Sequence, residues 1–292
     1  MSDFAGSDFW LGPALVQLER YYWAPGGPAE KTRADMRAFA AGKWKRALGI
    51  FFEHYAFERG GAPSNWGRIA RKAVEDYPDS GDLGALPAHA WNQFTSQVSA
   101  PNEKSNPLAI SYPRLPATRF ISTLLEDDHN IIRWAVRRMS SGDAVASHKD
   151  LQAITGIGPK IASLFLRDVV TSHQVSEARL DDRRAIMPVD VWVRRAVESI
   201  AHEPDLVNED DVQNAALEIA DRLGIGIATL DTGLWVLGAR FARSKLKLKQ
   251  LLADPSAFEA FVRDQRVQTE AAAFALKAVA QAMVDRRGGR IS

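Results

Sequence analysis

Residues 151–170 read LQAITGIGPKIASLFLRDVV, which is two apolar stretches joined by a short glycine turn. Gly156 and Gly158 allow the turn a backbone conformation that residues with a Cβ resist. Pro159 suits the first position of a second helix, because the N–H that it lacks would have no partner there. The sequence therefore predicts two helices joined by a tight hairpin turn over about residues 147–170.

The flanking residues indicate the limits and the packing of this hairpin. Ser147 and Asp150 match a capping box, so we expect the first helix to start there and to run to about Thr155. We expect Ile157 to fill the space between the two helices. Apolar residues at helical spacing predict the buried stripe of the second helix, with Ala162 small enough for close packing: Ile161, Leu164, Phe165 and Val169.

Such a hairpin has two interpretations. In a DNA-binding hairpin, the backbone N–H groups of Gly156, Ile157 and Gly158 face outwards with the N-terminus of the second helix and bind a phosphate. In an ordinary turn between two helices, a glycine merely caps the first one. The full pattern L-x-x-I-x-G-I-G-x-K-I-A is far more specific than a lone G-x-G, and it favours DNA binding.

Helical periodicity dominates the rest of the chain. No run shows convincing strand alternation except KLKLK at 245–249, which fits a helix end equally well. We therefore expect an all-α protein. Pro, Ser and Asn predict an irregular connector over residues 99–116. Helices are expected at 13–23, 34–57, 66–77, 90–98, 117–139, 191–202, 209–223, 229–242 and 256–285.

A second motif, MPVDVWVRRAVESI, spans residues 187–200. Asp190 is expected at the N-cap or in the first turn of a helix that buries Val193, Val197 and Ile200. The positive end of a helix stabilises a carboxylate. Most aspartates at such positions are only caps, so this motif alone does not define a site.

Taken together, G-x-G-x-K at 156–160 and P-V-D-V-x-x-x-R at 188–195 resemble the signature of the helix-hairpin-helix, Gly/Pro-Asp superfamily of DNA glycosylases. The resemblance is closest to the bifunctional 8-oxoguanine glycosylase and endonuclease III branches. It covers residues 147–200, and LDTGLWVLGARF at 230–241 resembles a C-terminal helix of these proteins more loosely.

The resemblance implies that Lys160 is the nucleophile and Asp190 the catalytic carboxylate of a glycosylase that also has lyase activity. It further implies two helical lobes with a DNA-binding cleft between them. We expect a central lobe from about 29–185, which contains the hairpin. The second lobe would combine 1–28 with 186–292 and carry Asp190.

These roles agree with the chemistry of the two side chains. An amine must be unprotonated to attack, and the positive end of a helix favours that form for Lys160. A fixed ionised Asp190 would stabilise the positive charge that develops on the sugar as the base departs. The target atom lies inside the duplex, so the nucleotide must first be flipped into a pocket. An oxidised purine such as 8-oxoguanine is the first expectation for the excised base.

Composition excludes some cofactors and localisations. The chain has no cysteine, so disulfides and iron–sulfur clusters are excluded, and its six histidines form no metal-binding pair. We expect no cofactor and no metal. MSDFAGSDFWLGP carries no signal-peptide pattern, and no run is long and apolar enough for a membrane span, so a cytoplasmic protein is expected. No surface stripe suggests an interface, so we expect a monomer.

Four basic stretches are candidate DNA contacts: residues 133–139, 181–184, 193–195 (with Arg194 and Arg195) and 243–249. Each of them alone also fits a solvated face. The connector 171–187 is longer than is usual in the family, and it could fold over the pocket. The base-binding residues stay unassigned among eight tryptophans: Trp10, Trp23, Trp44, Trp66, Trp91, Trp134, Trp192 and Trp235.

Two alternatives to a repair glycosylase stay open. The first is a glycosylase of the same fold that excises an enzymatically modified base, such as one carried by phage DNA. The second is a non-catalytic hairpin module that binds DNA or a repair partner. In that case Lys160 contacts a phosphate and Asp190 is only a cap.

Overall fold

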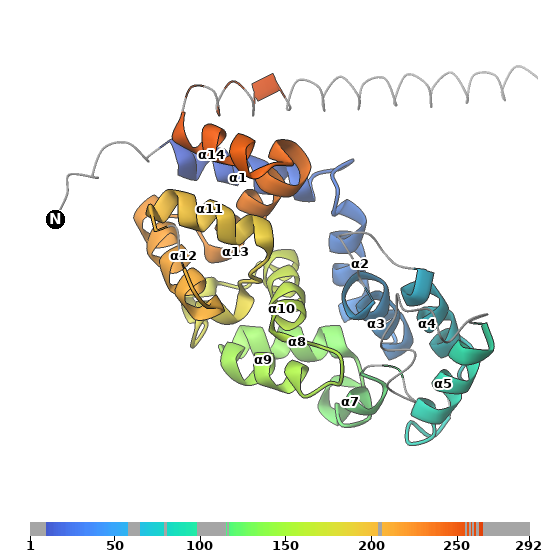
Figure 1. Ribbon diagram of the computed structural model, residues 1–292. Helices are drawn as coiled ribbons and strands as arrows, with labels where there is room; N and C mark the ends of the chain where they lie inside the picture. Colours follow the sequence, from blue (N-terminus) through green and yellow to red (C-terminus); the bar gives the residue numbers. More distant parts are fainter. Residues whose placement is uncertain are drawn as a thin grey trace, which may run out of the picture.

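The computed structural model describes residues 10–57, 65–78, 81–97, 115, 117–203, 206–254, 256, 258, 260, 263 and 264. All regular elements among these residues are helical, with no strand, which confirms the expected all-α class (Figure 1). Most of the expected connector 99–116 and of the expected helix 256–285 lies outside the described residues.

Short helices make up the chain before the hairpin. They are α1 (Leu11–Trp23), α2 (Glu30–Ala40), α3 (Trp44–Phe51), the π-helical turn η1 (Phe52–Ala56), α4 (Asn65–Glu75), α5 (Leu86–Gln97), α7 (Thr118–Ser122), the 3-10 turn η2 (Leu125–Asp127) and α8 (Ile131–Ser141). Two of the long helices expected from periodicity, 34–57 and 117–139, are therefore each divided into shorter elements.

The buried amide of Asn130 accounts for both of these breaks. Its Oδ1 caps α8 by accepting from the backbone N–H groups of Ile132 and Arg133, both at 3.0 Å. Its Nδ2 donates to the carbonyls of Phe39 (2.7 Å) and Gly42 (3.0 Å), where α2 ends. This one amide therefore satisfies carbonyl groups at the end of α2 and N–H groups at the start of α8, so both helix limits depend on it.

The second half of the chain follows the expected pattern closely. Its elements are α9 (Ala144–Gln152), α10 (Pro159–His173), the 3-10 turns η3 (Glu177–Arg179) and η4 (Arg183–Ile186), α11 (Val191–Ala201), α12 (Glu209–Leu223), α13 (Ile227–Trp235), the π-helical turn η5 (Val236–Ala242) and α14 (Lys245–Ala253). The KLKLK run, which resembles a strand, is helical in α14.

Helix α10 lies at the centre of the molecule. It packs against α2, η1, α8, α9 and η4. Figure 1 shows it between α11–α14, in yellow to orange, and α2–α5, in blue to teal. Helix α1, at the start of the described chain, packs against α13 near its other end. The first and last described helices therefore lie on the same side of the molecule (Figure 1). The turn that leads into α10 thus belongs to a helix that packs against elements both before and after it in the chain.

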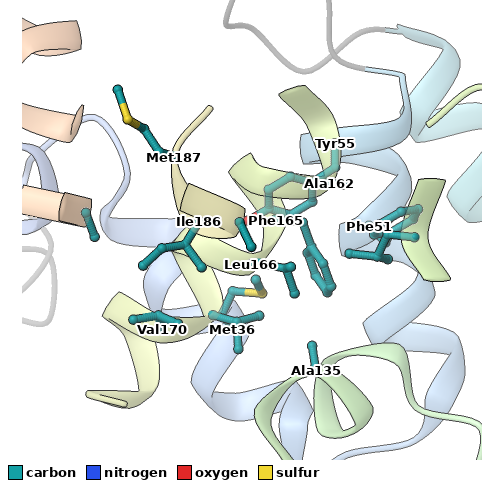
Figure 2. Packing of buried hydrophobic residues seen from close by; sticks show 14 of the residues in the cluster. Met36, Phe51, Tyr55, Ala135, Ala162, Phe165, Leu166, Val170, Ile186 and Met187 are labelled. Carbon is teal, nitrogen blue, oxygen red and sulfur yellow. The ribbon is translucent and has the colours of Figure 1, made fainter. Parts of the chain in front are cut away.

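The core confirms part of the stripe expected for α10 and extends it. Phe165 is fully buried, with its ring 5.2 Å from that of Phe51 and 5.1 Å from that of Tyr55, in edge-on contacts (Figure 2). Leu166 and Val170 are buried on another side of the same helix. Ile161 and Leu164 are only partly buried. Beyond its first turn, α10 is therefore enclosed on several sides and held firmly.

Candidate functional site

The turn between α9 and α10 uses its two glycines differently. Gly156 has φ +88°, a conformation that residues with a Cβ rarely adopt. Gly158 has φ −88° and ψ 175°, which any residue adopts, and a Cβ built there would meet no atom within 4 Å. Ile157 is 4% exposed and packs in the core, as expected. The conformation of the turn therefore requires Gly156 alone.

The start of α9 differs from the prediction. The helix begins at Ala144 and ends at Gln152, so the capping box expected from Ser147 and Asp150 is wrong. Ser147 lies fully buried inside the helix. The acceptor is instead Asp181, whose Oδ1 binds the N–H of Ala144 at 2.9 Å and that of Val145 at 3.1 Å. A residue distant in sequence provides the cap, so no local motif could show it.

The N-terminus of α10 has no side-chain cap, whereas the helices directly before and after it in the sequence have one. Gly158 is the N-cap of α10 and offers no side chain, so the N–H groups of Lys160 and Ile161 have no side-chain acceptor. Each of the other described helices from α8 to α14 has such an acceptor: Asn130 for α8, Asp181 for α9, Asp190 for α11, Asn208 for α12, Glu177 for α13 and Ser244 for α14.

Lys160 lies in the first turn of α10 and is exposed to solvent. His148 of α9 braces this turn from the other side, because its Nε2 lies 3.1 Å from the carbonyl oxygen of Pro159 and 2.9 Å from Ser163 Oγ. The backbone that presents Lys160 is therefore fixed, although its ammonium group is free. No hydrogen bond or ion pair joins Lys160 to Asp190 in the described structure.

Asp190 is the N-cap of α11, as the sequence indicates. Its Oδ1 accepts from the backbone N–H groups of Trp192 (2.8 Å) and Val193 (2.9 Å). Its Oδ2 has no hydrogen-bond partner among the described residues. The carboxylate is half-buried. One oxygen is therefore held by the helix, while the other can face a ligand.

A buried ionic network, which was not predicted from the sequence, connects α10 with α13 and η1. Arg167 of α10 donates through Nη1 to Asp231 Oδ2 of α13 at 2.5 Å. It also donates through Nε (2.9 Å) and Nη2 (2.7 Å) to Asp168 Oδ1. The Tyr55 hydroxyl donates to Asp168 Oδ2 at 2.9 Å. All four residues are at least 96% buried.

Burial gives Asp231 an unusual protonation equilibrium. Desolvation raises the pKa of its carboxyl to about 7, although Arg167 acts in the opposite direction, and the charges of Asp190 and Asp168 raise it further. Asp190 is therefore close enough for its charge to act on Asp231. The sequence signal for this network is the adjacent pair Arg167 and Asp168, which interrupts an otherwise apolar run.

The connector 171–187 joins helices instead of standing alone as a loop. Glu177 caps α13 by accepting from the N–H groups of Ile227 (2.7 Å) and Ala228 (3.1 Å). Asp181 caps α9, as described above. Arg183 forms a two-pronged pair with Asp221 of α12, at 2.8 and 2.9 Å. The added length therefore ties α9 to α12 and α13.

Two of the four basic stretches form ion pairs within the molecule. The pairs in these stretches are Arg133 with Asp128, Arg137 with Asp127 and Glu126, Arg138 with Asp143 and Asp150, Arg183 with Asp221, and Arg184 with Asp182. Arg194 instead donates to the carbonyl of Leu206 at 2.5 Å, and Arg195 lies 5.2 Å from the centre of the Trp192 ring. The stretches 133–139 and 181–184 are thus already neutralised by carboxylates.

Neither Lys160 nor Asp190 lines either of two surface hollows in the described structure. One, of about 450 Å³, lies between α11 and α12 and includes Glu203 and Arg222. The other, of about 370 Å³, lies beside the hairpin and is lined by Ile154, Thr155 and Arg119 among others. The hairpin turn therefore borders a groove on the side of α7.

Comparisons with known proteins add no relative to this picture. A scan against protein-family models, a search of curated proteins and a search of solved structures each gave no match. Within the described ranges, no three acidic or histidine side chains gather as a metal site would require. None of the helices described is both long and apolar enough to cross a membrane. The motifs and the geometry around α10 and α11 are therefore the features that indicate a function.

Proposed function

We propose that the protein is a DNA glycosylase with lyase activity, of the helix-hairpin-helix type that its motifs resemble. The observation that carries the proposal is the open N-terminus of α10, which presents Lys160 directly after a glycine turn. Asp190 supports it, with one carboxylate oxygen free at the start of α11. Double-stranded DNA that contains a damaged or modified base is the proposed partner, bound by a monomer without a cofactor.

The hairpin is suited to hold a DNA phosphate. The N–H groups at the start of α10 have no side-chain acceptor, and the helix dipole favours an anion there. A Cβ at position 158 would meet open space, which leaves room for a phosphate oxygen beside the turn. Such a contact fixes the register of the duplex and reads no sequence.

Lys160 would act on the nucleotide that is flipped out of this duplex. Its neutral Nζ forms a bond to C1′ of the sugar as the glycosidic bond breaks, and the base leaves with the bonding electrons and takes up a proton. The sugar ring then opens to an imine. Loss of a C2′ proton expels the 3′ phosphate, which cuts the strand. A bracing contact from His148 keeps the first turn of α10 in place during these steps.

Asp190 would stabilise the positive charge on the sugar while the base departs. Its Oδ1 is held by two N–H groups, so the carboxylate cannot turn away, and Oδ2 is left to face the substrate. The buried Arg167–Asp231 pair links α10 to α13, and α13 packs against α11. We propose that this link keeps the nucleophile and the carboxylate in a fixed relation.

The arrangement of helices supports the division into two lobes proposed from the motifs. Helix α1 packs against α13, as expected if residues 1–28 join 186–292, whereas α2, α8 and α9 pack against α10. We propose that the cleft lies along α10, between these groups. An oxidised purine is the first substrate to test, and an enzymatically modified base is the alternative.

Borohydride trapping tests the proposal. The purified protein is mixed with a duplex that contains an abasic site and is reduced with borohydride, which converts an imine into a permanent bond. We expect an adduct with wild type and none with Lys160→Gln. Lys149→Gln is the matched control, because Lys149 is also exposed and lies on α9. If neither wild type nor any variant forms an adduct, the lyase proposal is wrong.

A second function, DNA binding without catalysis, is favoured by one observation. Asp190 makes the two hydrogen bonds of an ordinary N-cap, and a cap needs no catalytic role. Under this interpretation Lys160→Gln weakens DNA binding modestly and there is no base release to lose. Base release by wild type, and its loss in Asp190→Asn with folding retained, would exclude it.

A further inference from the structure

One group of basic side chains, carried by elements that pack against one another, lacks carboxylate partners among the described residues. Its side chains come from three elements, α11, η5 and α14, and from the residues that join η5 to α14. We call these seven side chains the α11–α14 basic surface, although α12 and α13 contribute none: Arg194, Arg195, Arg240, Arg243, Lys245, Lys247 and Lys249. None of them forms a salt bridge within the part of the chain that the structure describes. The same three elements and the residues that join η5 to α14 hold a single acidic residue, Glu198. The whole chain has a formal net charge of only +1, so this surface is strongly set apart.

The arginines of this surface are held by neutral groups. Arg195 lies over the Trp192 ring at 5.2 Å, and Arg240 lies over the Trp235 ring at 5.5 Å. Arg243 donates to the carbonyl of residue 240 at 2.9 Å. Rings and carbonyls orient a guanidinium group but leave its positive charge uncompensated. These arginines are therefore positioned and still available to an anion.

The lysines lie on α14, which packs against both α11 and η5. Lys245, Lys247 and Lys249 are all exposed, and Figure 1 shows α14 beside α11 at the upper left of the molecule. Leu248 and Leu251 face the core. Seven cations on three packed elements repel one another, and a polyanion relieves that repulsion while its own counterions are released.

The surface adjoins the proposed site. Helix α11 starts directly after Asp190, and Arg194 lies one helical turn further along. The two basic stretches that are paired internally, 133–139 and 181–184, belong to other elements. The other two basic stretches, 193–195 and 243–249, have no carboxylate partners in the described structure. Both follow Asp190 in the chain.

We propose that the α11–α14 basic surface binds the phosphate backbone of duplex DNA outside the hairpin contact. This inference rests on the proposed function and extends its footprint to the second lobe. A membrane surface is a poorer fit, because Leu246 is the one large apolar side chain exposed on α14 and insertion requires an apolar face. Phosphates of a duplex require charge alone.

The test is the salt dependence of DNA binding. Fluorescence anisotropy with an undamaged labelled duplex gives the dissociation constant over a range of salt concentrations. Replacing Lys245, Lys247 and Lys249 with Gln should reduce the slope of log K against log salt by about 2 to 3, because each phosphate contact contributes about 0.9. An unchanged slope in the triple variant would overturn the proposal.

The matched control removes three positive charges elsewhere. Lys31, Arg68 and Lys72 are exposed on α2 and α4, away from α14 in Figure 1, and their triple Gln variant should keep the wild-type slope. An equal reduction in both variants would show a net-charge effect and overturn the proposal. The triple variant of Lys245, Lys247 and Lys249, called the α14 variant, is also tested on phosphatidylcholine–phosphatidylserine vesicles. If it loses vesicle binding while the salt dependence of its DNA binding stays at the wild-type value, the proposal is likewise overturned.

The same samples separate this inference from the proposed function. Borohydride trapping of wild type on an abasic duplex reports on Lys160 and does not depend on the salt slope. If wild type is trapped normally and the α14 variant keeps the wild-type slope of log K against log salt, the proposal for the basic surface alone is wrong. A reduced slope with no adduct from wild type would remove the glycosylase proposal and support the DNA-binding surface.

Discussion

The replacement Gly158→Asp should make the protein more stable and a poorer DNA binder. Position 158 has φ −88° and ψ 175°, close to the N-cap Asp190 at φ −110° and ψ 178°, and a Cβ there would touch nothing within 4 Å. An aspartate at this position can therefore accept from the N–H groups of Lys160 and Ile161, as Asp190 does from those of its own helix.

The size of the stability gain follows from three small terms. A capping side chain is worth a few tenths of a kcal/mol over glycine. A carboxylate at the positive end of a helix adds about 0.3–1 kcal/mol. Loss of glycine from the unfolded chain adds about 0.4–1 kcal/mol. We expect a gain of about 1–2 kcal/mol, or about 2–4 °C in melting temperature for a chain of this size.

The effect on DNA binding has the opposite sign. The new carboxylate occupies the N–H groups proposed for a phosphate, and it repels that phosphate. Hydrogen bonds to a charged group are worth about 1.5–3 kcal/mol, so the affinity for duplex DNA should fall by about tenfold to a hundredfold. Thermal melting followed by circular dichroism, and anisotropy with a labelled duplex, measure the two effects on one sample.

Two further variants isolate the cause. Gly158→Ala adds no acceptor, and its weaker capping and its smaller unfolded-state entropy nearly cancel, so both quantities should stay near wild type. Gly158→Asn adds an acceptor without a charge and should give an intermediate loss of affinity. A more stable Gly158→Asp that binds DNA as tightly as wild type would refute the phosphate site at α10. A less stable one would refute the open N-terminus itself.

Three other predictions concern stability. Asp231→Asn should flatten the pH dependence: the pKa of this carboxyl rises from 3.8 to about 7 on folding, so the folded state holds the proton and its contribution to stability falls as pH rises through that interval. Urea unfolding of both proteins between about pH 4 and about pH 8, a range that spans both pKa values, measures this, and parallel pH profiles would contradict it. Asp181→Ala should cost about 1 kcal/mol in urea unfolding, because two N–H groups of α9 lose their acceptor, whereas Asp150→Ala, which removes an exposed pair, should cost less than about 0.5. Phe165→Ala should cost about 3–5 kcal/mol in the same assay, and a loss below about 1 would show that the core around α10 is not closely packed.

Features determined by neighbouring residues could be predicted from the sequence. The all-α class, the helix starting at Pro159, the burial of Ile157 and the N-cap role of Asp190 each depend on spacing within one or two helical turns. The helix limits were less accurate. The sequence indicates one helix over 34–57, but Asn130 ends α2 from a distant part of the chain, and periodicity carries no record of such a partner.

Features that depend on distant partners could not be predicted. The capping box from Ser147 and Asp150 satisfies the local rule, yet Asp181 provides the cap because the connector folds back onto α9. The pairing of Arg167 with Asp231 joins residues that only the fold brings together. Similarly, basic runs look alike in the sequence, and only the structure shows which ones already have carboxylate partners.

The central claim is that Lys160 is the nucleophile, and mapping the attachment site of a trapped adduct tests it most directly. The wild-type protein is reduced with borohydride on an abasic duplex, digested with a protease and a nuclease, and analysed by tandem mass spectrometry. We expect a sugar-derived mass on Lys160, in a peptide that includes this residue. An adduct on another lysine or on the terminal amine, or no adduct at all, would contradict it.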